Sequence, residues 1–283
     1  MPQLNIIFIK QYSTMGVSII LRNKNDPHIR ECLEQFSNIS YDSYEIVMID
    51  SSDTITPTPN NIKITIQQVV VGRMEALKIG ASIAKFKKIL ILDADQTISS
   101  NLLFEIDNME QDMLIVPERS LNKNLVGILM DAKRSYLLNY SKLNGGPKLP
   151  VIPRVYNKKL FQASINNLQE QEIKVVVQHE DSLIYYEAYK ISRSLGYCSN
   201  FILNQDPSVP DFLLSSYKYG LANQKALNSH FMTEEHSRLI KQLDRQRVIF
   251  NKELGLNYGI LADIVKGIPY IFGTIVGRFT TPQ

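Results

Sequence analysis

Four short apolar runs alternate with helix-like segments over residues 17–116, and this alternation constrains the fold more than any other feature. The runs are VSIIL at 17–21, EIVMI at 45–49, KILIL at 88–92 and MLIV at 113–116. Runs of this length and composition are typical of strands buried on both faces, as in a parallel sheet. The sequence therefore predicts an α/β fold with a doubly wound, mostly parallel sheet and right-handed crossovers.

Two segments between these runs have the pattern of amphipathic helices. The first is predicted over residues 27–38, with Asp26 as the N-cap and Pro27 in the first helical position. The second is predicted over residues 73–86, where small and apolar side chains share one face. The second half of the chain is less regular, and NQDPSVPD at 204–211 is predicted to be irregular because of its prolines. The other elements predicted there are helices at 125–143, 182–192 and 216–227, and strands at 151–156 and 175–177.

The composition limits the classes of protein to which the chain can belong. With 283 residues, of which 44% are hydrophobic and 21% charged, the chain can bury a substantial core. Cys32 and Cys198 are the two cysteines, which is typical of buried thiols in a reducing compartment and not of a disulfide framework. No signal-peptide pattern opens the sequence, and the apolar stretch 267–277 is too short to span a membrane, so we expect a cytoplasmic protein.

The C-terminal region is basic and partly apolar. Residues 236–283 contain seven Lys or Arg against three acidic residues, although the whole chain has a net charge of only +3. This composition predicts a helical tail that contacts an anionic membrane surface, while packing against the rest of the protein is the alternative. Nucleic acid is excluded as a partner, because the basic residues are not interleaved with stacking aromatic residues.

The residues that follow three of the apolar runs are polar: RNKND at 22–26, DSSD at 50–53 and DADQ at 93–96. Open α/β sheets bind ligands beyond the carboxyl ends of their strands, so these residues are the candidates for a site. Asp93 and Asp95 are one residue apart at a strand end, so both point the same way and can hold a hard divalent cation, Mg²⁺ or Mn²⁺. A solvated acidic turn is the alternative.

Several segments, in order, resemble a family 2 glycosyltransferase with the GT-A fold, and the resemblance covers residues 17–230. The segments are VSIILRNKN, EIVMIDSSDT, RMEALKIGASIAKFKKILILDAD, HEDSLIYYEA and SSYKYGLANQKAL. The resemblance implies a catalytic domain over residues 1–235, with a nucleotide-sugar half at 17–118, an acceptor half at 119–235 and the helical tail at 236–283. It also implies an inverting, metal-dependent transfer from a nucleoside-diphosphate sugar, such as a UDP- or GDP-sugar.

The resemblance assigns roles to residues on the donor side. It implies that Arg22, Asp50 and Arg73 contact the nucleoside, that Asp93 approaches the ribose and the metal, and that Asp95 ligates the metal that bridges the diphosphate. A turn-forming acid is the alternative for Asp50, and a surface residue at a helix start is the alternative for Arg73.

On the acceptor side, the resemblance implies that Asp181 is the catalytic base and that Glu180 orients it or binds the acceptor. A carboxylate there would remove the proton of the attacking hydroxyl. Both acids would also stabilise the dipole of the helix that follows, which is the alternative explanation. The acceptor is left open between a hydroxyl, as on a glycan, and a lipid-linked phosphate, for which no base is required.

The sequence departs from the family pattern at two places. Ala76, Leu77 and Lys78 stand where many relatives have Ala-Arg-Asn, and a histidine that can complete the metal shell is absent, which leaves Asp206 or water as the remaining ligand. Two other functions compete with the transferase. One is a non-catalytic protein that binds a sugar nucleotide, and the other is a nucleotidylyltransferase, which usually needs a glycine-rich loop where residues 22–30 have no glycine.

Overall fold

The computed structural model describes residues 15–54, 56–144, 146–147, 151–229, 231–253 and 258–279. The strands are β1 (Val17–Asn23), β2 (Tyr44–Asp50), β3 (Ile64–Gln68), β4 (Lys88–Asp93), β5 (Gln96–Ile98), β6 (Met113–Ile115), β7 (Glu118–Ser120), β8 (Val155–Asn157), β9 (Leu195–Tyr197) and β10 (Ile202–Asn204). The helices are α1 (Ile29–Phe36), α2 (Arg73–Ile83), α3 (Leu102–Asn108), α4 (Leu125–Asn144), α5 (Lys158–Asn166), α6 (Glu170–Val175), α7 (Glu180–Ile191), α8 (Val209–Asn228), α9 (Glu234–Glu253) and α10 (Tyr258–Phe279).

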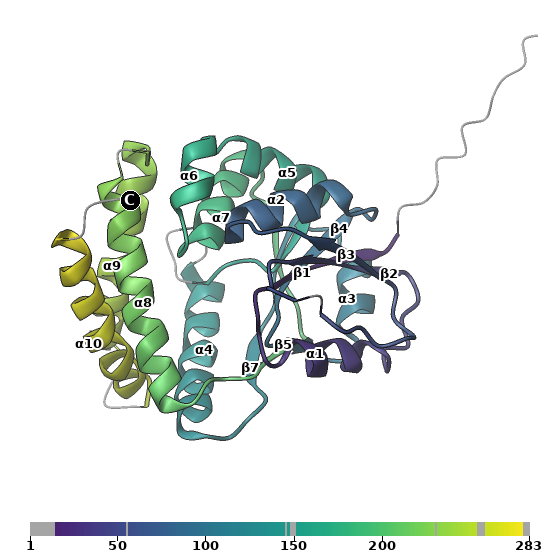
Figure 1. Ribbon diagram of the computed structural model, residues 1–283, viewed down its shortest axis with the longest axis horizontal. Helices are drawn as coiled ribbons and strands as arrows, with labels where there is room; N and C mark the ends of the chain where they lie inside the picture. Colours follow the sequence, from purple (N-terminus) through teal and green to yellow (C-terminus); the bar gives the residue numbers. More distant parts are fainter. Residues whose placement is uncertain are drawn as a thin grey trace, which may run out of the picture.

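The central sheet has the strand order β3-β2-β1-β4-β8-β6-β9, and β1 pairs in parallel with β2 and with β4. β8 is antiparallel to both β4 and β6, so the sheet is mixed but mostly parallel, as predicted. A small second sheet has the order β5-β10-β7. The predicted α/β class is therefore confirmed, and the four apolar runs all form strands of the central sheet (Figure 1).

Helices cover both faces of the central sheet (Figure 1). Side chains alternate along β1, so Ile19 and Leu21 join the core beneath α1 and α3, while Ile20 joins the core beneath α2 and α5. In α2, Gly80 lets the helix lie against Ile20, because a Cβ there would come within 2.5 Å of that side chain. Cys32 and Cys198 are buried and free, as expected for structural thiols.

α1 begins at Ile29 with His28 as its N-cap, so Asp26 is not the N-cap and Pro27 is not in the first helical position. Two other local predictions are also wrong. The valines at 175–177 do not form a strand, because α6 ends at Val175 and Val176 packs beneath α7 from an extended loop. The stretch 204–211 is also more regular than predicted. α8 begins at Val209, capped by the Ser208 side chain, and tolerates Pro210 because the first helical turn needs no amide donor there.

α8, α9 and α10 stand beside the sheet together with α4 (Figure 1). α10 runs in the same direction as α8, and the two helices approach closely at Gly220 and Gly273. A Cβ at Gly220 would lie 2.0 Å from the Tyr270 carbonyl oxygen, and one at Gly273 would lie 2.1 Å from the Tyr217 carbonyl oxygen. In the part of the chain that the structure describes, no helix is long and apolar enough to cross a bilayer.

Substitution of Gly273 by alanine tests this helix contact. Because the new methyl would meet backbone and not a flexible side chain, we expect Gly273→Ala to lower the free energy of unfolding by about 1–3 kcal/mol. Gly267→Ala is the matched control in the same helix, since a Cβ there has nothing within 4 Å. The control substitution should leave the free energy of unfolding unchanged or raise it by up to about 1 kcal/mol. Denaturant titrations that give equal changes for the two variants would contradict the close approach.

Candidate active site

The carboxyl ends of three neighbouring strands bring the predicted site residues together. Asn23 of β1 pairs with Asp50 of β2, and Arg22 of β1 pairs with Asp93 of β4. α2 begins beside them at Arg73, and α7 approaches with its amino-terminal end. Parallel pairing places all these strand ends at one edge of the sheet, which is why residues distant in sequence meet.

Asp93 is surrounded by arginines. Its Oδ1 atom accepts from Arg22 at 2.6 Å and from Arg73 at 3.4 Å, and its Oδ2 atom lies 3.9 Å from Arg154 NH1. Burial favours the neutral carboxyl, but the three guanidinium groups outweigh it and hold the pKa of Asp93 well below its usual range. Asp93 is therefore ionised at any physiological pH.

Glu180 and Asp181 open α7 and differ in their environment. Glu180 Oε1 accepts from Arg73 Nε at 2.6 Å and from Arg22 NH1 at 3.1 Å. Although burial opposes ionisation, these contacts lower the pKa of Glu180. The side chain therefore joins both arginines to the start of α7, an arrangement in keeping with the predicted orienting role.

Asp181 has weaker partners than its neighbour. Its Oδ2 atom lies 3.6 Å from Arg154 NH1 and its Oδ1 atom lies 3.9 Å from Arg22 NH1, while Oδ1 is buried and accepts no hydrogen bond within the described part of the chain. Burial and the adjacent Glu180 carboxylate raise the pKa of Asp181. A carboxylate with raised proton affinity and an uncommitted oxygen can take a proton from a bound hydroxyl group.

Asp95 lies in surroundings that disfavour its charged form. Among the described residues, its carboxylate forms no ion pair with Lys or Arg, in contrast to Asp93. Burial, reinforced by the carboxylates of Asp93 and Asp26, raises the pKa of Asp95 to about 7. Oxygen ligands with an excess of negative charge are the donor set that Mg²⁺ or Mn²⁺ requires, so the residues fit such an ion.

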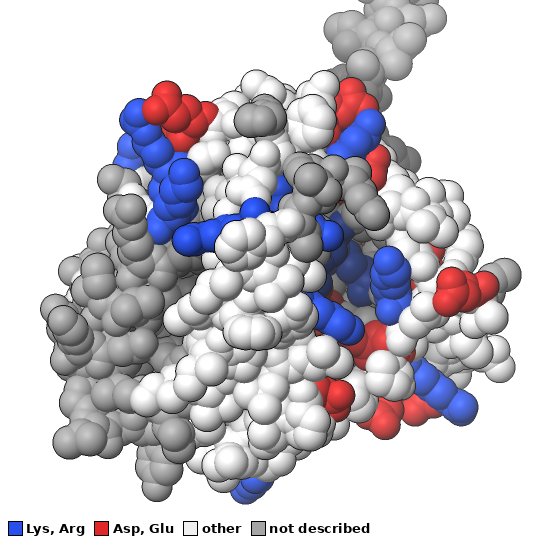
Figure 2. All heavy atoms as spheres, turned by 60° about the vertical axis from the view of Figure 1, so that its left-hand side comes forward, with Lys and Arg blue, Asp and Glu red and all other residues white. Residues whose placement is uncertain are grey.

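Two cavities open on these residues. One, of about 280 Å³, is lined by Arg22, Arg73, Asp93 and Asp95. The other, of about 210 Å³, is lined by Arg73, Asp93, Arg154, Glu180 and Asp181. We call them the donor cavity and the acceptor cavity, after the roles that we propose for them below. Figure 2 shows a hollow in the molecule in which basic and acidic side chains lie together. The two cavities share Arg73, Asp93 and Tyr219, so they adjoin at these side chains.

Asp50 is fully buried and does not line either cavity. Its Oδ1 atom accepts from Asn23 Nδ2 at 3.1 Å and from the Ser52 amide at 3.0 Å, and its Oδ2 atom accepts from the Thr56 hydroxyl at 2.7 Å. Asp50 therefore orders the loop after β2. A contact between Asp50 and the nucleoside stays a prediction.

Asp206, the alternative metal ligand, lies in a separate ion pair. Arg134 donates to both of its carboxylate oxygens, at 2.9 and 3.0 Å. Both oxygens are therefore engaged by the guanidinium group, and the choice between Asp206 and water as the remaining metal ligand stays a prediction. Arg134 also lies 3.8 Å from Glu118, which in turn accepts from Arg154 Nε at 2.8 Å.

The sequence reasoning missed three residues of the site: Glu118, Arg154 and Tyr219. Glu118 follows the apolar run at 113–116 after Pro117, so the rule applied to the other strand ends also indicates it. Tyr219 lies in the helical segment that carries the family resemblance, yet its side chain was given no role. Arg154 offers no comparable signal, because it lies before a strand and is placed by the antiparallel pairing of β8.

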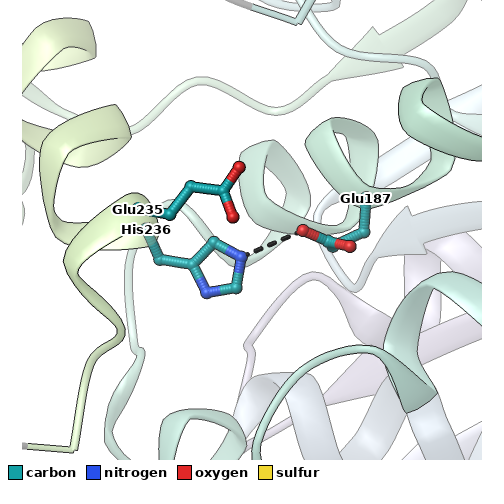
Figure 3. A group of neighbouring side chains, drawn as sticks. All are labelled: Glu187, Glu235 and His236. Carbon is teal, nitrogen blue, oxygen red and sulfur yellow. Dashed lines mark hydrogen bonds and ion pairs between the residues drawn. The ribbon is translucent and has the colours of Figure 1, made fainter.

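A second cluster of potential metal ligands consists of Glu187, Glu235 and His236 (Figure 3). Its charges are already matched: Lys190 Nζ lies 2.7 Å from Glu187 Oε1 and 3.0 Å from Glu235 Oε1. The His236 ring contacts Glu187 Oε1 at 3.1 Å and Glu172 Oε1 at 2.8 Å. We therefore interpret this cluster as an ion-pair network that ties the start of α9 to α6 and α7.

Comparison with known proteins identifies the fold. No protein-family model and no curated protein sequence matches the chain. Among solved structures, residues 1–349 of TarS from S. aureus superpose with a TM-score of 0.50 at 17% identity, covering 93% of this chain and 81% of that one. Its complex with UDP gives a TM-score of 0.50 at 15% identity, covering 93% and 90%. The mannosyltransferase PcManGT from Pyrobaculum calidifontis, in complex with GDP-Man and Mn²⁺, gives a TM-score of 0.54 at 14% identity. This match covers 93% of this chain and 84% of that one. The chain therefore has the mixed α/β fold of GT-A-type glycosyltransferases.

Proposed function

We propose that the protein is an inverting glycosyltransferase that moves a sugar from a UDP- or GDP-sugar to a hydroxyl or lipid-phosphate acceptor. The observation that carries the proposal is the meeting of two cavities at one edge of the sheet. Asp93 and Asp95 line the donor cavity, and Asp181 lines the acceptor cavity. An inverting transferase needs this arrangement, because the acceptor attacks the sugar carbon from the side opposite to the one from which the diphosphate departs.

The donor cavity has the chemistry that a nucleoside diphosphate requires. Arg22 and Arg73 both line it, and guanidinium groups are well suited to donate to phosphate oxygens. Asp95, with Asp93, would hold Mg²⁺ or Mn²⁺, and the bound ion would supply positive charge beside the departing diphosphate. Arg22 and Arg73 also form ion pairs with Asp93 and Glu180.

The acceptor cavity supplies the group that removes a proton. Asp181 would accept the proton of the attacking hydroxyl at a carboxylate oxygen, and Glu180 would keep the start of α7 in place through its contacts with Arg22 and Arg73. Attack from the side opposite the leaving group inverts the configuration at the sugar carbon. The two solved structures of the same fold, one with UDP and the other with GDP-Man and Mn²⁺, support a donor of this class.

The test is release of the nucleoside diphosphate. The full-length protein is incubated with UDP-GlcNAc or GDP-mannose, and UDP or GDP is quantified with Mn²⁺, with Mg²⁺ and with EDTA. We expect release that depends on the ion and stops in EDTA. Binding of donors in a calorimeter without any release, across donors and with added acceptors, would instead identify a non-catalytic sugar-nucleotide-binding protein.

We also propose that α10 rests on an anionic lipid surface, which would place the enzyme at the inner face of the cell membrane near lipid-linked acceptors. Large apolar side chains of α10 are about half to fully exposed, and residues 264–279 contain two basic and no acidic residues. Figure 2 shows a broad strip without charged side chains on the side of the molecule where α8 and α10 lie. The exposed apolar residues are Ile264, Ile268, Ile271, Phe272, Ile275 and Phe279.

Vesicle sedimentation tests the lipid contact. The wild-type protein should sediment with vesicles that contain phosphatidylglycerol and not with purely zwitterionic vesicles. Ile268→Glu combined with Phe272→Glu should abolish this binding, because carboxylates do not enter an apolar, anionic interface. The control combines Phe104→Glu with Leu143→Glu, which changes exposed apolar residues outside α10. Equal sedimentation of both double variants would contradict the contact.

A further inference from the structure

Three residues line both the donor cavity and the acceptor cavity, and they show where the transferred sugar lies in the proposed reaction. The sugar to be transferred is bonded to the diphosphate on one side and attacked by the acceptor on the other. It must therefore lie where the two cavities adjoin, which is at Arg73, Asp93 and Tyr219. This argument rests on the proposed function and adds to it a position for the transferred sugar.

The three shared side chains differ in what they can offer to a sugar. Arg73 and Asp93 are charged and are already joined to Glu180 and Arg22 by ion pairs. Tyr219 is the one of the three that has an apolar face. Sugar rings expose C–H groups on one face and hydroxyls around the edge, so an aromatic ring beside polar groups is complementary to them.

The position of Tyr219 is fixed by the helices behind it. It extends from α8, and the next residue, Gly220, is the point where α8 lies against the backbone of α10 at Tyr270. Tyr219 is partly buried, and the charges of Arg73, Asp93 and Glu180 are close enough to influence its hydroxyl group. The packed helices therefore fix the backbone beside Tyr219, and its side chain lines both cavities next to the charged strand ends.

We infer that the ring of Tyr219 packs against the transferred sugar and contributes to the selection of the donor. Arg73 and Asp93 complete this sugar subsite with hydrogen-bonding groups for the hydroxyls. The C-terminal helices thus supply part of the donor site, although the nucleoside and diphosphate are held by the strand ends.

The experiment compares the affinity of the full-length protein for UDP-GlcNAc with its affinity for UDP, and for GDP-mannose with GDP, by calorimetry with Mn²⁺. The quantity of interest is the ratio of the two dissociation constants, because a change in this ratio reports the contribution of the sugar to binding. Tyr219→Ala should weaken binding of the sugar nucleotide relative to the nucleotide by about threefold to tenfold. Tyr219→Phe should leave the ratio unchanged, since the ring remains. Lys218→Ala, at an exposed position of the same helix, is the control for the helix itself.

The outcomes are distinguishable. A ratio that changes in Tyr219→Ala but not in Tyr219→Phe or Lys218→Ala supports the subsite. If the wild-type protein binds the sugar nucleotides and the ratio in Tyr219→Ala equals the wild-type ratio, the subsite is refuted and the proposed function stands. If Phe and Ala change the ratio equally, the ring packing is refuted in favour of a contact through the hydroxyl group. Absence of nucleotide and sugar-nucleotide binding by the wild-type protein overturns the proposed function and the subsite together.

Discussion

Asp181→Asn is expected to slow donor hydrolysis by about 10²- to 10⁴-fold while leaving donor affinity unchanged. Hydrolysis is a suitable reaction because water then acts as the acceptor and must lose a proton. Asparagine has nearly the same shape as aspartate but cannot accept that proton. Asp181 lies in the acceptor cavity and not in the donor cavity, so binding of the sugar nucleotide should not change.

Asp112→Asn is the matched control, since it makes the same substitution at an acidic residue that lines neither cavity and accepts from the Ser192 hydroxyl. Initial rates of UDP or GDP release and calorimetric donor affinities are measured for both variants. If the rate of Asp181→Asn is within threefold of the wild-type rate, Asp181 is not the catalytic base. A parallel loss of donor affinity would instead indicate a structural role.

Asp95→Asn is expected to have two opposite effects, a loss of activity and a gain of stability. Activity should fall by about 10²- to 10³-fold, as for removal of one electrostatic stabiliser of a transition state, and Mn²⁺ should no longer raise the melting temperature. The metal-free protein should become more stable at pH 8, because the substitution removes a partly buried carboxylate that no Lys or Arg of the described residues pairs with.

The pH dependence of this gain follows from the pKa of Asp95. Its pKa is raised from an ordinary value near 4 to about 7 in the folded protein. The folded state therefore holds the proton more tightly than the unfolded chain, and the resulting stability is present below pH 4 and is lost as the pH rises through 7. The Asp95→Asn variant has no carboxyl group at this position, so its stability does not fall as the pH rises. Its melting temperature should therefore exceed that of the wild type at pH 8 and match it near pH 4.

Melting curves with EDTA at several pH values test this pattern. In domains slightly smaller than this one, each kcal/mol corresponds to about 2–4 °C in melting temperature, so the difference is measurable. A melting temperature of Asp95→Asn below that of the wild type at pH 8 would show that Asp95 stabilises the fold, which is contrary to our interpretation of it as an uncompensated ligand.

The parts of the fold that depend on long apolar runs were predictable from the sequence. β1, β2 and β4 form around runs that are apolar except for one residue each, namely Ser18, Glu45 and Lys88. Residues at the ends of these strands lie together because parallel strands share an edge. Short strands without an apolar run, such as residues 195–197, were not predictable, since three residues carry no periodic signal and their pairing is set by the tertiary structure. The valines at 175–177 illustrate the reverse error, because an apolar run indicates burial without specifying a strand.

The site, like the fold, has parts that the sequence predicted and parts that it did not. Motifs at strand ends indicated Arg22, Asp93 and Asp95, all of which line the donor cavity. The ion pairs among them were not predictable, since they depend on where α7 and β8 place Glu180 and Arg154. The sequence also did not indicate that Asp50 would be enclosed by hydrogen bonds, because those bonds come from a loop without a characteristic pattern.

The central claim is that Asp95, together with Asp93, holds a divalent cation against a diphosphate in the donor cavity. The most direct measurement is the anomalous scattering of manganese in crystals of the protein grown with UDP and Mn²⁺. The account predicts a manganese peak at about 2.0–2.2 Å from a carboxylate oxygen of Asp95, with diphosphate oxygens bound to the same ion. A manganese ion bound elsewhere, with the Asp93 and Asp95 carboxylates remote from both ion and diphosphate, would contradict it.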